Sequence, residues 1–281
     1  GTAAMLGLYA KEVQFYRDLA PQLPVRTPRT LFADIAADGA SFMLLFEDLG
    51  PARGGNQIAG CTLADARAVV QQAAALHAPS WHNPAILDRD WLQPSPTAAA
   101  QVKALYPQAQ AVFRERYADL LEPEFMALCE ALAEVTAATN RAPEKVSLVH
   151  GDFRLDNILF DIKGGAEPVA VLDWQTLTIG NGLTDIGYLL GCGIGDQLRR
   201  AHERELLELY CAEMAARGAA MRVDDIWRDY VVGALHGVST AVFSAAFVVR
   251  TARGDANFLS MARGACALCL EHGSLAMMTK G

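Results

Sequence analysis

The sequence lacks an excess of basic residues. Its 281 residues contain 24 Lys and Arg against 32 Asp and Glu, which gives a formal net charge of −8. A protein that binds nucleic acid without regard to sequence needs a basic stripe that displaces counterions from the phosphates. We therefore expect no nucleic-acid partner, although a few cations or a bound metal can still offset the phosphates of a single nucleotide.

The sequence also lacks a cysteine framework and a secretory signal. Its six cysteines are scattered along the chain, which is typical of a reducing compartment, and the N-terminus has no charged start or cleavage site. Cys266 and Cys269 form a C-x-x-C pair, but no second pair or nearby His completes a zinc site. We predict a cytoplasmic protein in which these two residues are buried helical thiols, with a redox or metal role as the alternative.

A membrane span is not expected. Residues 230–249 contain no Asp, Glu, Lys or Arg and are long enough to cross a bilayer. They nevertheless include His236, Ser239, Thr240 and Ser244 among glycines and alanines, and such residues suit a helix packed inside a protein. We predict a buried helix here, while the oligomeric state cannot be read from the sequence.

The first fifty residues combine one helix with two strands. Residues 11–19 have apolar positions at helical spacing and stop before Pro21. Residues 30–35 and 41–46 read as strands on either side of an Ala-Asp-Gly turn. A glycine-rich stretch at 50–60 follows, so we place a domain boundary there.

Residues 51–281 read as a larger, mainly helical domain. Thr62 opens a helix in a pattern that resembles a capping box, and helical spacing dominates from residue 98 onward. Short β-like runs at 147–175 interrupt this rhythm. We therefore expect an α+β protein of two unequal parts, 1–50 and 51–281, with a hairpin inserted in the second part.

The segment that carries chemistry is His150-Gly-Asp152-Phe-Arg154-Leu-Asp-Asn157, followed by Leu-Asp173-Trp-Gln. If a hairpin is centred near Gly165, Asn157 and Asp173 face each other at one end of two antiparallel strands. Asp152 lies on the loop just before Asn157. Two carboxylates and an amide oxygen would then converge at one place.

Oxygen ligands of this kind suit Mg²⁺, which binds through one or two carboxylates together with substrate phosphates. A further acidic group nearby can take a proton from a hydroxyl nucleophile. The alternative is that Asp152 and Asn157 cap turns and Asp173 ends a strand, since Asp and Asn are ordinary turn residues. The combination at this spacing favours the functional interpretation.

At these residues the chain resembles the aminoglycoside phosphotransferase and choline kinase family, which has the protein-kinase-like fold. The H-G-D-x-x-x-x-N loop of that family matches His150, Gly151, Asp152 and Asn157, and the aspartate of its metal-binding motif matches Asp173. Within that family, the residues of the two motifs are most similar to those of ecdysteroid-kinase-like and acyl-CoA-dehydrogenase-associated small-molecule kinases. The resemblance implies a two-lobe fold with a truncated, β-containing N-lobe at 1–50 and a large helical C-lobe at 51–281.

The resemblance also implies roles for individual residues. Asp152 would deprotonate the acceptor hydroxyl, and Asn157 and Asp173 would hold Mg²⁺ on the phosphates of ATP. Arg154 would neutralise charge on the transferring phosphoryl group, or would be a surface residue or a partner of Asp156.

Other residues would support the loop or the nucleotide. His150 and Asp185 would brace the catalytic loop, although Asp185 could also be an ordinary helix N-terminal residue. Glu12 would match the glutamate that pairs with the ATP-contacting lysine, although such a residue is usually solvated. The expected hinge beside adenine follows the second strand and comprises Glu47, Asp48 and Leu49.

Two departures from the family pattern shape the hypothesis. No glycine-rich loop or phosphate-contacting lysine precedes Glu12, so we expect either an omitted or disordered N-terminal stretch or a degenerate kinase. Asp173 and Asp185 are too close for a protein-kinase activation segment, and no A-P-E motif is present. We expect a small hydroxylated acceptor, with a pseudokinase-like binding or scaffold module as the alternative.

The acceptor pocket is expected between the catalytic loop and the C-terminal helices. Aromatic, amide and imidazole side chains there are candidates for its lining, although residues of this kind at helical spacing are more often part of the core. The candidates are Trp174, Gln175, Trp227, Tyr230 and His236.

Overall fold

The computed structural model describes residues 7–93, 95–138 and 144–279. The helices are α2 Leu8–Gln14, α3 Leu63–Ser80, α4 Pro84–Leu87, α5 Pro96–Tyr117, α6 Pro123–Ala138, α7 Ile162–Gly165, α8 Leu183–Tyr188, α9 Asp196–Ala216, α10 Val223–Gly233, α11 Leu235–Phe247, α12 Ala252–His272 and α13 Ser274–Thr279. The strands are β1 Thr30–Ile35, β2 Phe42–Phe46, β3 Arg53–Gly54, β4 Ser147–Val149, β5 Ile158–Asp161, β6 Glu167–Val171 and β7 Thr178–Gly180.

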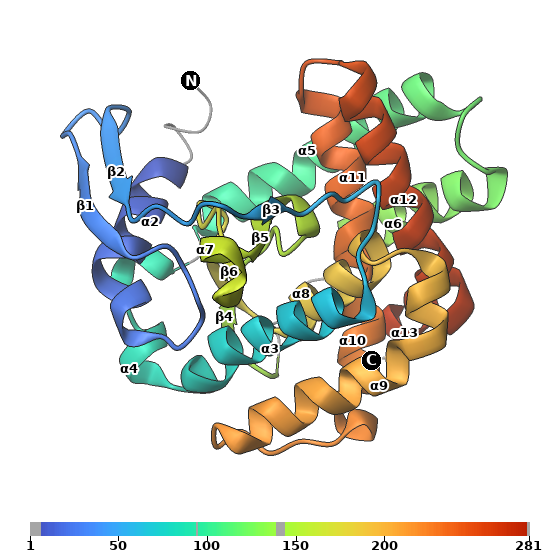
Figure 1. Ribbon diagram of the computed structural model, residues 1–281. Helices are drawn as coiled ribbons and strands as arrows, with labels where there is room; N and C mark the ends of the chain where they lie inside the picture. Colours follow the sequence, from blue (N-terminus) through green and yellow to red (C-terminus); the bar gives the residue numbers. More distant parts are fainter. Residues whose placement is uncertain (1–6, 94, 139–143, 280–281) are drawn as a thin grey trace.

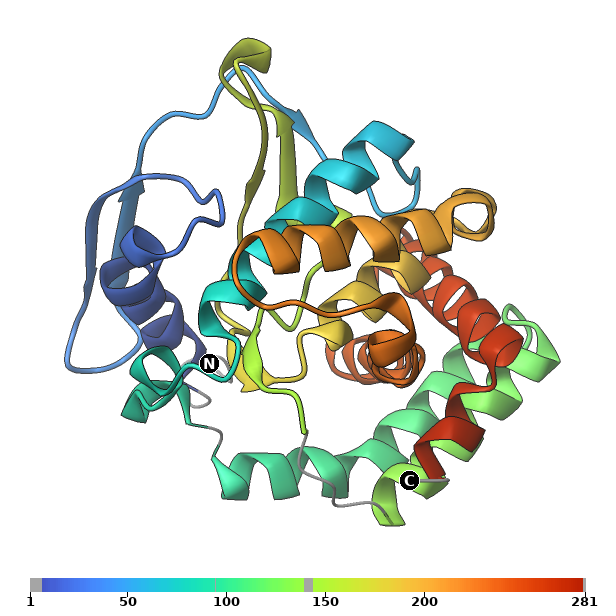
Figure 2. The ribbon, with the colours of Figure 1, turned by 90° about the horizontal axis from the view of Figure 1, so that it is seen from below.

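The elements divide into a small β-containing part and a large helical part (Figure 1). β1 and β2 form an antiparallel pair beside α2, whereas β3, β5 and β6 form a second sheet and β4 pairs with β7. Seen from below, α9 and α3 lie side by side across the helical part (Figure 2), and they are in extensive contact. The small strands of the second and third sheets therefore lie at the junction of the two parts.

The structure confirms most of the expected elements. β1 and β2 cover the two predicted strands, and the Thr62 side chain caps α3 by accepting from the N–H of Asp65 at 3.1 Å. The predicted helix at 11–19 is α-helical only up to Gln14 and continues as a π-helix to Leu19. Its apolar face is nevertheless buried in the core.

The apolar segment 230–249 is divided between α10 and α11. α11 packs against α5 and α12. The continuous run Val223–Phe247 is long and apolar enough to cross a membrane by composition, and more than half of its most apolar window is buried inside the protein. Cys266 and Cys269 are buried free thiols on α12, as predicted.

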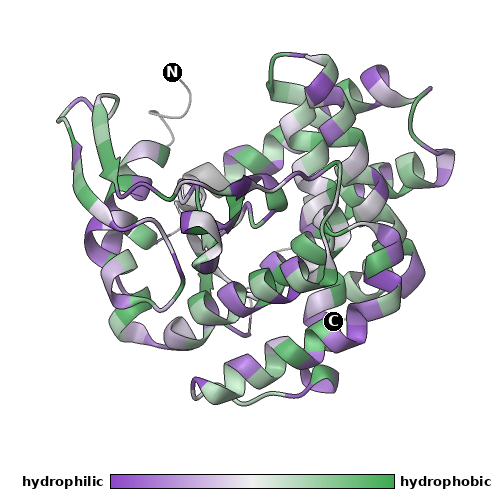
Figure 3. Ribbon diagram, in the orientation of Figure 1, coloured by the Kyte–Doolittle hydropathy of each residue, from purple (hydrophilic) through white to green (hydrophobic). Residues whose placement is uncertain are grey.

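The outward face of the β1–β2 pair is apolar. Leu31, Phe32, Met43 and Leu45 are each about half exposed or more, and the hydropathy colours show apolar stretches along both strands (Figure 3). Tyr9 of α2 covers part of the pair by stacking on Phe42, with ring centroids 4.7 Å apart.

The β5–β6 hairpin differs from the predicted register by one residue. The prediction set Asn157 opposite Asp173, but Leu172 lies opposite Asn157 and donates its N–H to the Asn157 carbonyl at 2.9 Å. The reason is the turn at 163–166, in which Lys163 has a left-handed backbone with φ 55°. This turn shifts the centre of the hairpin slightly toward the N-terminus, so Asp173 lies just beyond the paired strands.

A ring stack and an ion-pair network are among the contacts that join the small part to the hairpin and to the residues that follow it. The first is a stack of the Phe15 ring on the Trp174 ring, with centroids 4.0 Å apart. The second is a network in which the guanidinium of Arg26 and the ammonium of Lys163 each pair with both Glu47 and Glu167. These charges lie on three separate segments, so the network fixes the strand end at Glu47 against the hairpin turn.

The network gives the fold a defined sensitivity to acid. Hydrogen bonds from Lys163 and the Arg29 N–H lower the pKa of Glu47 to about 2, and Arg26 and Lys163 lower the pKa of Glu167 to about 2. Because both folded-state values lie below the unfolded value of about 4.3, the stabilisation is present above that value and is lost as the pH falls toward 2.

We predict that Glu47→Gln lowers the melting temperature at pH 7 by a few degrees and makes it less dependent on pH between about 5 and 3. Melting curves of the wild type, the variant and the control Glu208→Gln measure this difference. Glu208 pairs with Arg204 on the exposed face of α9, so its loss should change neither quantity by more than the error. An unchanged pH slope in Glu47→Gln would contradict the role of the network.

Candidate functional site

A buried carboxylate holds the 150–157 loop in place. Asp185, on the first turn of α8, is fully buried and accepts hydrogen bonds from the N–H groups of His150 at 2.7 Å and Gly151 at 3.0 Å. His77 of α3 contacts the same carboxylate through Nε2 at 3.2 Å. Burial alone would raise the pKa of Asp185, but the hydrogen bonds to His77 and Gly151 outweigh it, and the pKa lies below its usual value. An ionised Asp185 is therefore part of the folded state.

The backbone of the loop requires glycine at position 151. Gly151 has φ 83°, a left-handed conformation, and a Cβ atom there would lie 2.8 Å from the Thr176 carbonyl oxygen. The Gly151 carbonyl accepts a hydrogen bond from Nε2 of His236 at 2.7 Å. The loop is thus held by hydrogen bonds to two helices, to Asp185 of α8 and to His236 of α11.

His150 supports the loop as an imidazole of fixed orientation. Its Nε2 donates to the Leu172 carbonyl at 3.0 Å, while its Nδ1 accepts the N–H of Asp152 at 3.3 Å. Its ring also packs on the Trp174 ring, with centroids 4.6 Å apart. Through these contacts the residue links the loop to the end of β6.

Asp152 has its carboxylate fixed by three neighbouring side chains. Arg154 Nε contacts both carboxylate oxygens at 3.0 Å, Asn157 Nδ2 donates to Oδ2 at 2.8 Å, and the Tyr188 hydroxyl donates to Oδ1 at 2.9 Å. Arg154 also contacts Asp156 at 3.0 Å. The structure therefore shows the expected pair with Asp156, adds a pair with Asp152, and places the side chain of Arg154 largely out of solvent.

Asn157 and Asp173 are oxygen-bearing neighbours of Asp152, and Glu12 is a neighbour of Asp173. Burial raises the pKa of Asp173, and the negative charge of Asp152 raises it further. Burial and Asp173 likewise raise the pKa of Glu12, although Glu12 accepts the N–H of Trp174 at 3.3 Å. The amide nitrogen of Asn157 is committed to Asp152, so its oxygen is the atom left to bind a cation. The donor set has the hard oxygen chemistry that suits Mg²⁺.

The three expected hinge residues have different environments. The Glu47 carboxylate is occupied by the ion-pair network, and Asp48 accepts the Gly50 N–H at 2.8 Å. Leu49 is buried, and its carbonyl accepts the N–H of Lys163 at 2.8 Å. Residues 47–49 therefore lie against the hairpin turn.

A cavity of about 500 Å³ opens beside Asp152. Its walls come from the 150–157 loop, α5, α8, α11 and α12, and its lining includes Arg154, Tyr188 and His236. Of the five expected pocket residues, His236 belongs to this lining. The fully buried Trp174 is held between Phe15 and the loop, and Gln175 bonds to Asp173.

Trp227 and Tyr230 lie at a different place from the cavity lining. The Tyr230 hydroxyl donates to Glu203 of α9 at 2.5 Å, and the Trp227 ring meets the His272 ring edge-on at 4.9 Å. Both side chains lie on the side of α10 that faces α9 and the end of α12. This side does not face the 150–157 loop. The correct inference from their helical spacing was core packing.

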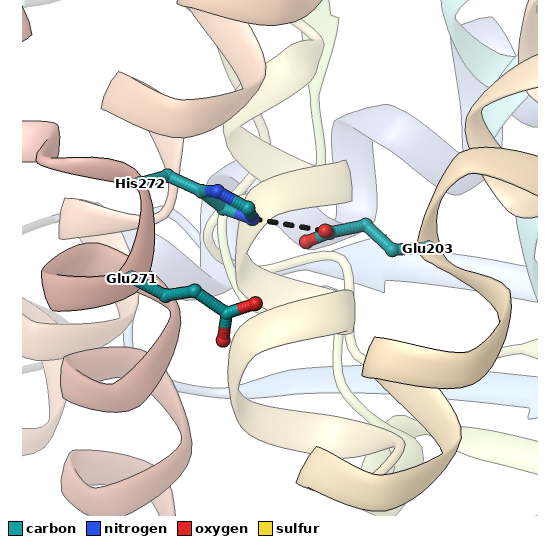
Figure 4. A group of neighbouring side chains, drawn as sticks. All are labelled: Glu203, Glu271 and His272. Carbon is teal, nitrogen blue, oxygen red and sulfur yellow. Dashed lines mark hydrogen bonds and ion pairs between the residues drawn. The ribbon is translucent and has the colours of Figure 1, made fainter.

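Glu203, Glu271 and His272 form a cluster with metal-ligand chemistry (Figure 4). His272 Nε2 contacts Glu203 at 2.9 Å, but the buried Arg199 guanidinium also contacts Glu203 at 3.2 Å and Glu271 at 2.8 Å. The arginine already supplies the positive charge that two carboxylates attract. We interpret this cluster as an ion-pair network that joins α9 to α12.

The sequence analysis singled out neither Tyr188 nor His77 as part of the site. Asp185 and Tyr188 are three residues apart on α8, so both side chains lie on one face of the helix. A helix that directs Asp185 at the loop necessarily directs Tyr188 there as well, and this spacing was the available signal. His77 gave no comparable signal, because its partner is distant in sequence.

Comparisons with known proteins identify related sequences and folds. A model of the phosphotransferase enzyme family matches residues 6–221. Acyl-CoA dehydrogenase family member 10 of Mus musculus is 49% identical over 45 residues, which are 16% of this chain and only 4% of that protein. The chain thus matches a small fraction of the length of this curated relative.

Solved structures share the architecture at low sequence identity. Choline kinase from Cryptosporidium parvum Iowa II is 10% identical with a TM-score of 0.61, over 98% of this chain and 79% of that chain. An aminoglycoside 2'-phosphotransferase-IIIa, solved as a GDP complex, is 18% identical with a TM-score of 0.54, over 93% and 82%. This likeness establishes the α+β, two-lobe kinase-like fold that the sequence predicted.

The bracing role of Asp185 predicts a large effect of Asp185→Asn. An amide has one acceptor oxygen and brings its own N–H₂ group toward the loop, so a buried N–H is left unpaired at a cost of about 1–3 kcal/mol. Urea denaturation should show a lower midpoint with an unchanged slope. The control Asp161→Asn replaces an exposed aspartate of the same protein and should leave the urea midpoint unchanged. Equal midpoints for wild type and Asp185→Asn would contradict the bracing role.

Proposed function

The chain belongs to the phosphotransferase enzyme family, and we propose that it is an ATP- and Mg²⁺-dependent kinase that transfers the γ-phosphoryl group to a hydroxyl of a small molecule. The observation that carries the proposal is the convergence of Asp152, Asn157 and Asp173 beside a cavity of about 500 Å³. We propose further that residues 1–50 and 51–281 act as the two lobes. A cytoplasmic location is consistent with six cysteines that are all free.

The proposed reaction assigns the proton to Asp152. An acceptor hydroxyl in the cavity would donate its hydrogen bond to this carboxylate, which accepts the proton as the oxygen attacks phosphorus. Asn157 and Tyr188 hold the carboxylate in one orientation. Arg154, whose guanidinium is oriented by Asp152 and Asp156, is proposed to compensate negative charge that develops during transfer.

Asp173 and Asn157 are the residues proposed to hold the metal. When bound, Mg²⁺ would neutralise the phosphate oxygens of the nucleotide. Cation binding would also relieve the repulsion between Asp173 and Asp152 that raises the pKa of Asp173. The backbone of the hinge at 47–49 is proposed to receive the base.

The proposed acceptor is a small molecule because the chain between Asp173 and Asp185 is short. Strand β7 and the start of α8 occupy this interval, which leaves no segment for docking a protein substrate. The competing proposal is a pseudokinase-like nucleotide-binding or scaffold module. It draws support from Glu12, for which we find no cationic partner among the residues that the structure describes.

Nucleotide binding separates the kinase from a scaffold module that binds no nucleotide, and phosphoryl transfer separates it from a nucleotide-binding pseudokinase. We predict that ATP with Mg²⁺ raises the melting temperature of the protein by several degrees and that ATP with EDTA does not, because the metal site couples the phosphates to Asp173. Asp173→Asn should abolish the Mg²⁺-dependent part of this rise in melting temperature. Asparagine tolerates the left-handed backbone at position 173, where φ is 61°. Asp161→Asn serves as the matched control, since Asp161 is also left-handed, with φ 52°. No response to ATP at any Mg²⁺ concentration would contradict the kinase proposal.

The assignment of the base predicts the effect of Asp152→Ala. Loss of a positioned acid or base lowers kcat by roughly 10²–10⁴-fold, whereas the melting shift caused by ATP and Mg²⁺ should persist. The measurement is ADP release in the presence of an active acceptor. If turnover survives this substitution intact, another group takes the proton.

A further inference from the structure

The cavity beside Asp152 is lined by several hydroxyl groups. Its volume of about 500 Å³ lies within the range of small-molecule sites, and Asp152 belongs to its lining. The serine and threonine residues of the lining are all partly exposed, so a molecule in the cavity can contact them. These residues are Thr176, Thr178, Ser239, Thr240 and Ser244.

Three lining residues form a stripe along α11. His236, Thr240 and Ser244 are spaced four residues apart, so their side chains lie on one face of the helix. Along the helix axis, Thr240 lies about 6 Å and Ser244 about 12 Å from His236. Because His236 Nε2 donates to the Gly151 carbonyl at 2.7 Å, the stripe starts at the 150–157 loop and continues along the helix.

Two of the hydroxyls are left as hydrogen-bond acceptors. Thr176 donates its hydroxyl hydrogen to the His150 carbonyl at 2.8 Å, and Ser239 donates its own to the His236 carbonyl at 3.0 Å. A hydroxyl has a single hydrogen and two acceptor lone pairs. The oxygens of Thr176 and Ser239 can therefore still accept a hydrogen bond from a ligand.

The other three hydroxyls can both donate and accept. The hydrogen on His236 Nε2 is donated to the Gly151 carbonyl, so Thr240 Oγ1, which lies 3.4 Å from that nitrogen, keeps its own hydrogen. The hydroxyls of Thr178 and Ser244 make no hydrogen bond within the part of the chain that the structure describes. An alcohol hydroxyl, which is itself both donor and acceptor, matches groups of this kind.

The lining offers these hydroxyls no free negative charge. Its single carboxylate is that of Asp152, which is paired with Arg154 at 3.0 Å. An ammonium group would lose its hydration without gaining an unpaired counter-charge, which is costly. A neutral hydroxyl only exchanges its hydrogen bonds with water for hydrogen bonds with serine and threonine. The lining therefore favours neutral ligands over cationic ones.

Apolar side chains complete the lining. Phe243 of α11 and Phe258 of α12 belong to it, and both rings are only partly buried in the core. Phe243 is the residue before Ser244, so an apolar surface lies next to the stripe of hydroxyls. Such rings stabilise a ligand by removing its C–H surface from water. A sugar or cyclitol ring presents both kinds of surface, with hydroxyls at its edge and C–H groups on its faces.

Building on the proposed function, we propose that the acceptor is a neutral polyol of the sugar or cyclitol class and that Thr178, Thr240 and Ser244 bind its non-reacting hydroxyls. The reacting hydroxyl donates its hydrogen to Asp152, while Phe243 covers C–H surface of the ring. Thr178, Thr240 and Ser244 are thus specificity-determining residues on β7 and α11.

Saturation-transfer NMR titrations of the full chain without nucleotide test this assignment independently of turnover. The neutral polyols are myo-inositol, glucose and galactose; the protonated counterparts are glucosamine and galactosamine; cyclohexylmethanol is a ring of the same size with one hydroxyl. We expect one or more of the neutral polyols to bind at least about tenfold more tightly than cyclohexylmethanol, which corresponds to about 1.4 kcal/mol. Each sugar should bind more tightly than its amino counterpart.

Isosteric substitutions on α11 sharpen the test. Thr240→Val and Ser244→Ala each remove one hydroxyl, so each should weaken binding of the best polyol by roughly 3–10-fold and leave cyclohexylmethanol unchanged. Both variants should melt at the wild-type temperature, because neither hydroxyl donates to a described residue. Thr279→Val is the matched control: its hydroxyl bonds to the Leu275 carbonyl at 3.2 Å on the exposed side of α13, and its loss should change no affinity.

The outcomes separate this inference from the proposed reaction. Wild-type protein that prefers cyclohexylmethanol or an amino sugar, or that binds none of the probes, would overturn the inference. Unchanged polyol affinity in both Thr240→Val and Ser244→Ala would also overturn it. Phosphoryl transfer to a cationic alcohol and to no neutral polyol would overturn it and leave the kinase proposal intact. The expected affinity order without any ATP turnover would support the binding preference while the proposed reaction fails.

Discussion

The geometry of the site depends on the buried carboxylate of Asp185. It accepts the N–H groups of His150 and Gly151, and it is itself held by His77 from a helix more than a hundred positions earlier in the chain. Burial of a charge is tolerated only when the surrounding hydrogen bonds compensate the lost hydration. Here they do, so the backbone before Asp152 has a single position, from which the side chain of Asp152 reaches both the cavity and the proposed metal ligands.

Charge balance explains the rest of the site. Arg154 offsets Asp152, whereas Asp173 and Glu12 are half-buried acids whose pKa values are raised by burial and by neighbouring negative charge. This imbalance favours a divalent cation at one side of Asp152. The other side, in contrast, is a cavity whose lining combines the Asp152–Arg154 pair with apolar side chains such as Phe243, Phe258 and Met261. The two halves of the proposed reaction, a charged nucleotide and an uncharged acceptor, therefore meet electrostatically different surfaces.

The sequence predicted what depends on local pattern and motif. The strands β1 and β2, the capped start of α3 and the two-lobe fold follow from hydrophobic spacing, turn residues and the spacing of Asp152, Asn157 and Asp173. The register of the hairpin does not, because it depends on the left-handed backbone at Lys163. Side chains of distant helices were also beyond reach: Trp227 and Tyr230 pack at the α9–α12 network, while the cavity takes much of its lining from α5, α11 and α12, whose sequences carry no motif.

The most direct test of the central claim is phosphorus NMR of the full chain with ATP, Mg²⁺ and a panel of hydroxylated compounds. The account predicts a new phosphomonoester resonance that grows as the γ-phosphate resonance of ATP declines, and that requires both Mg²⁺ and Asp152. A spectrum in which ATP stays unchanged with every compound, or yields only inorganic phosphate, would contradict it.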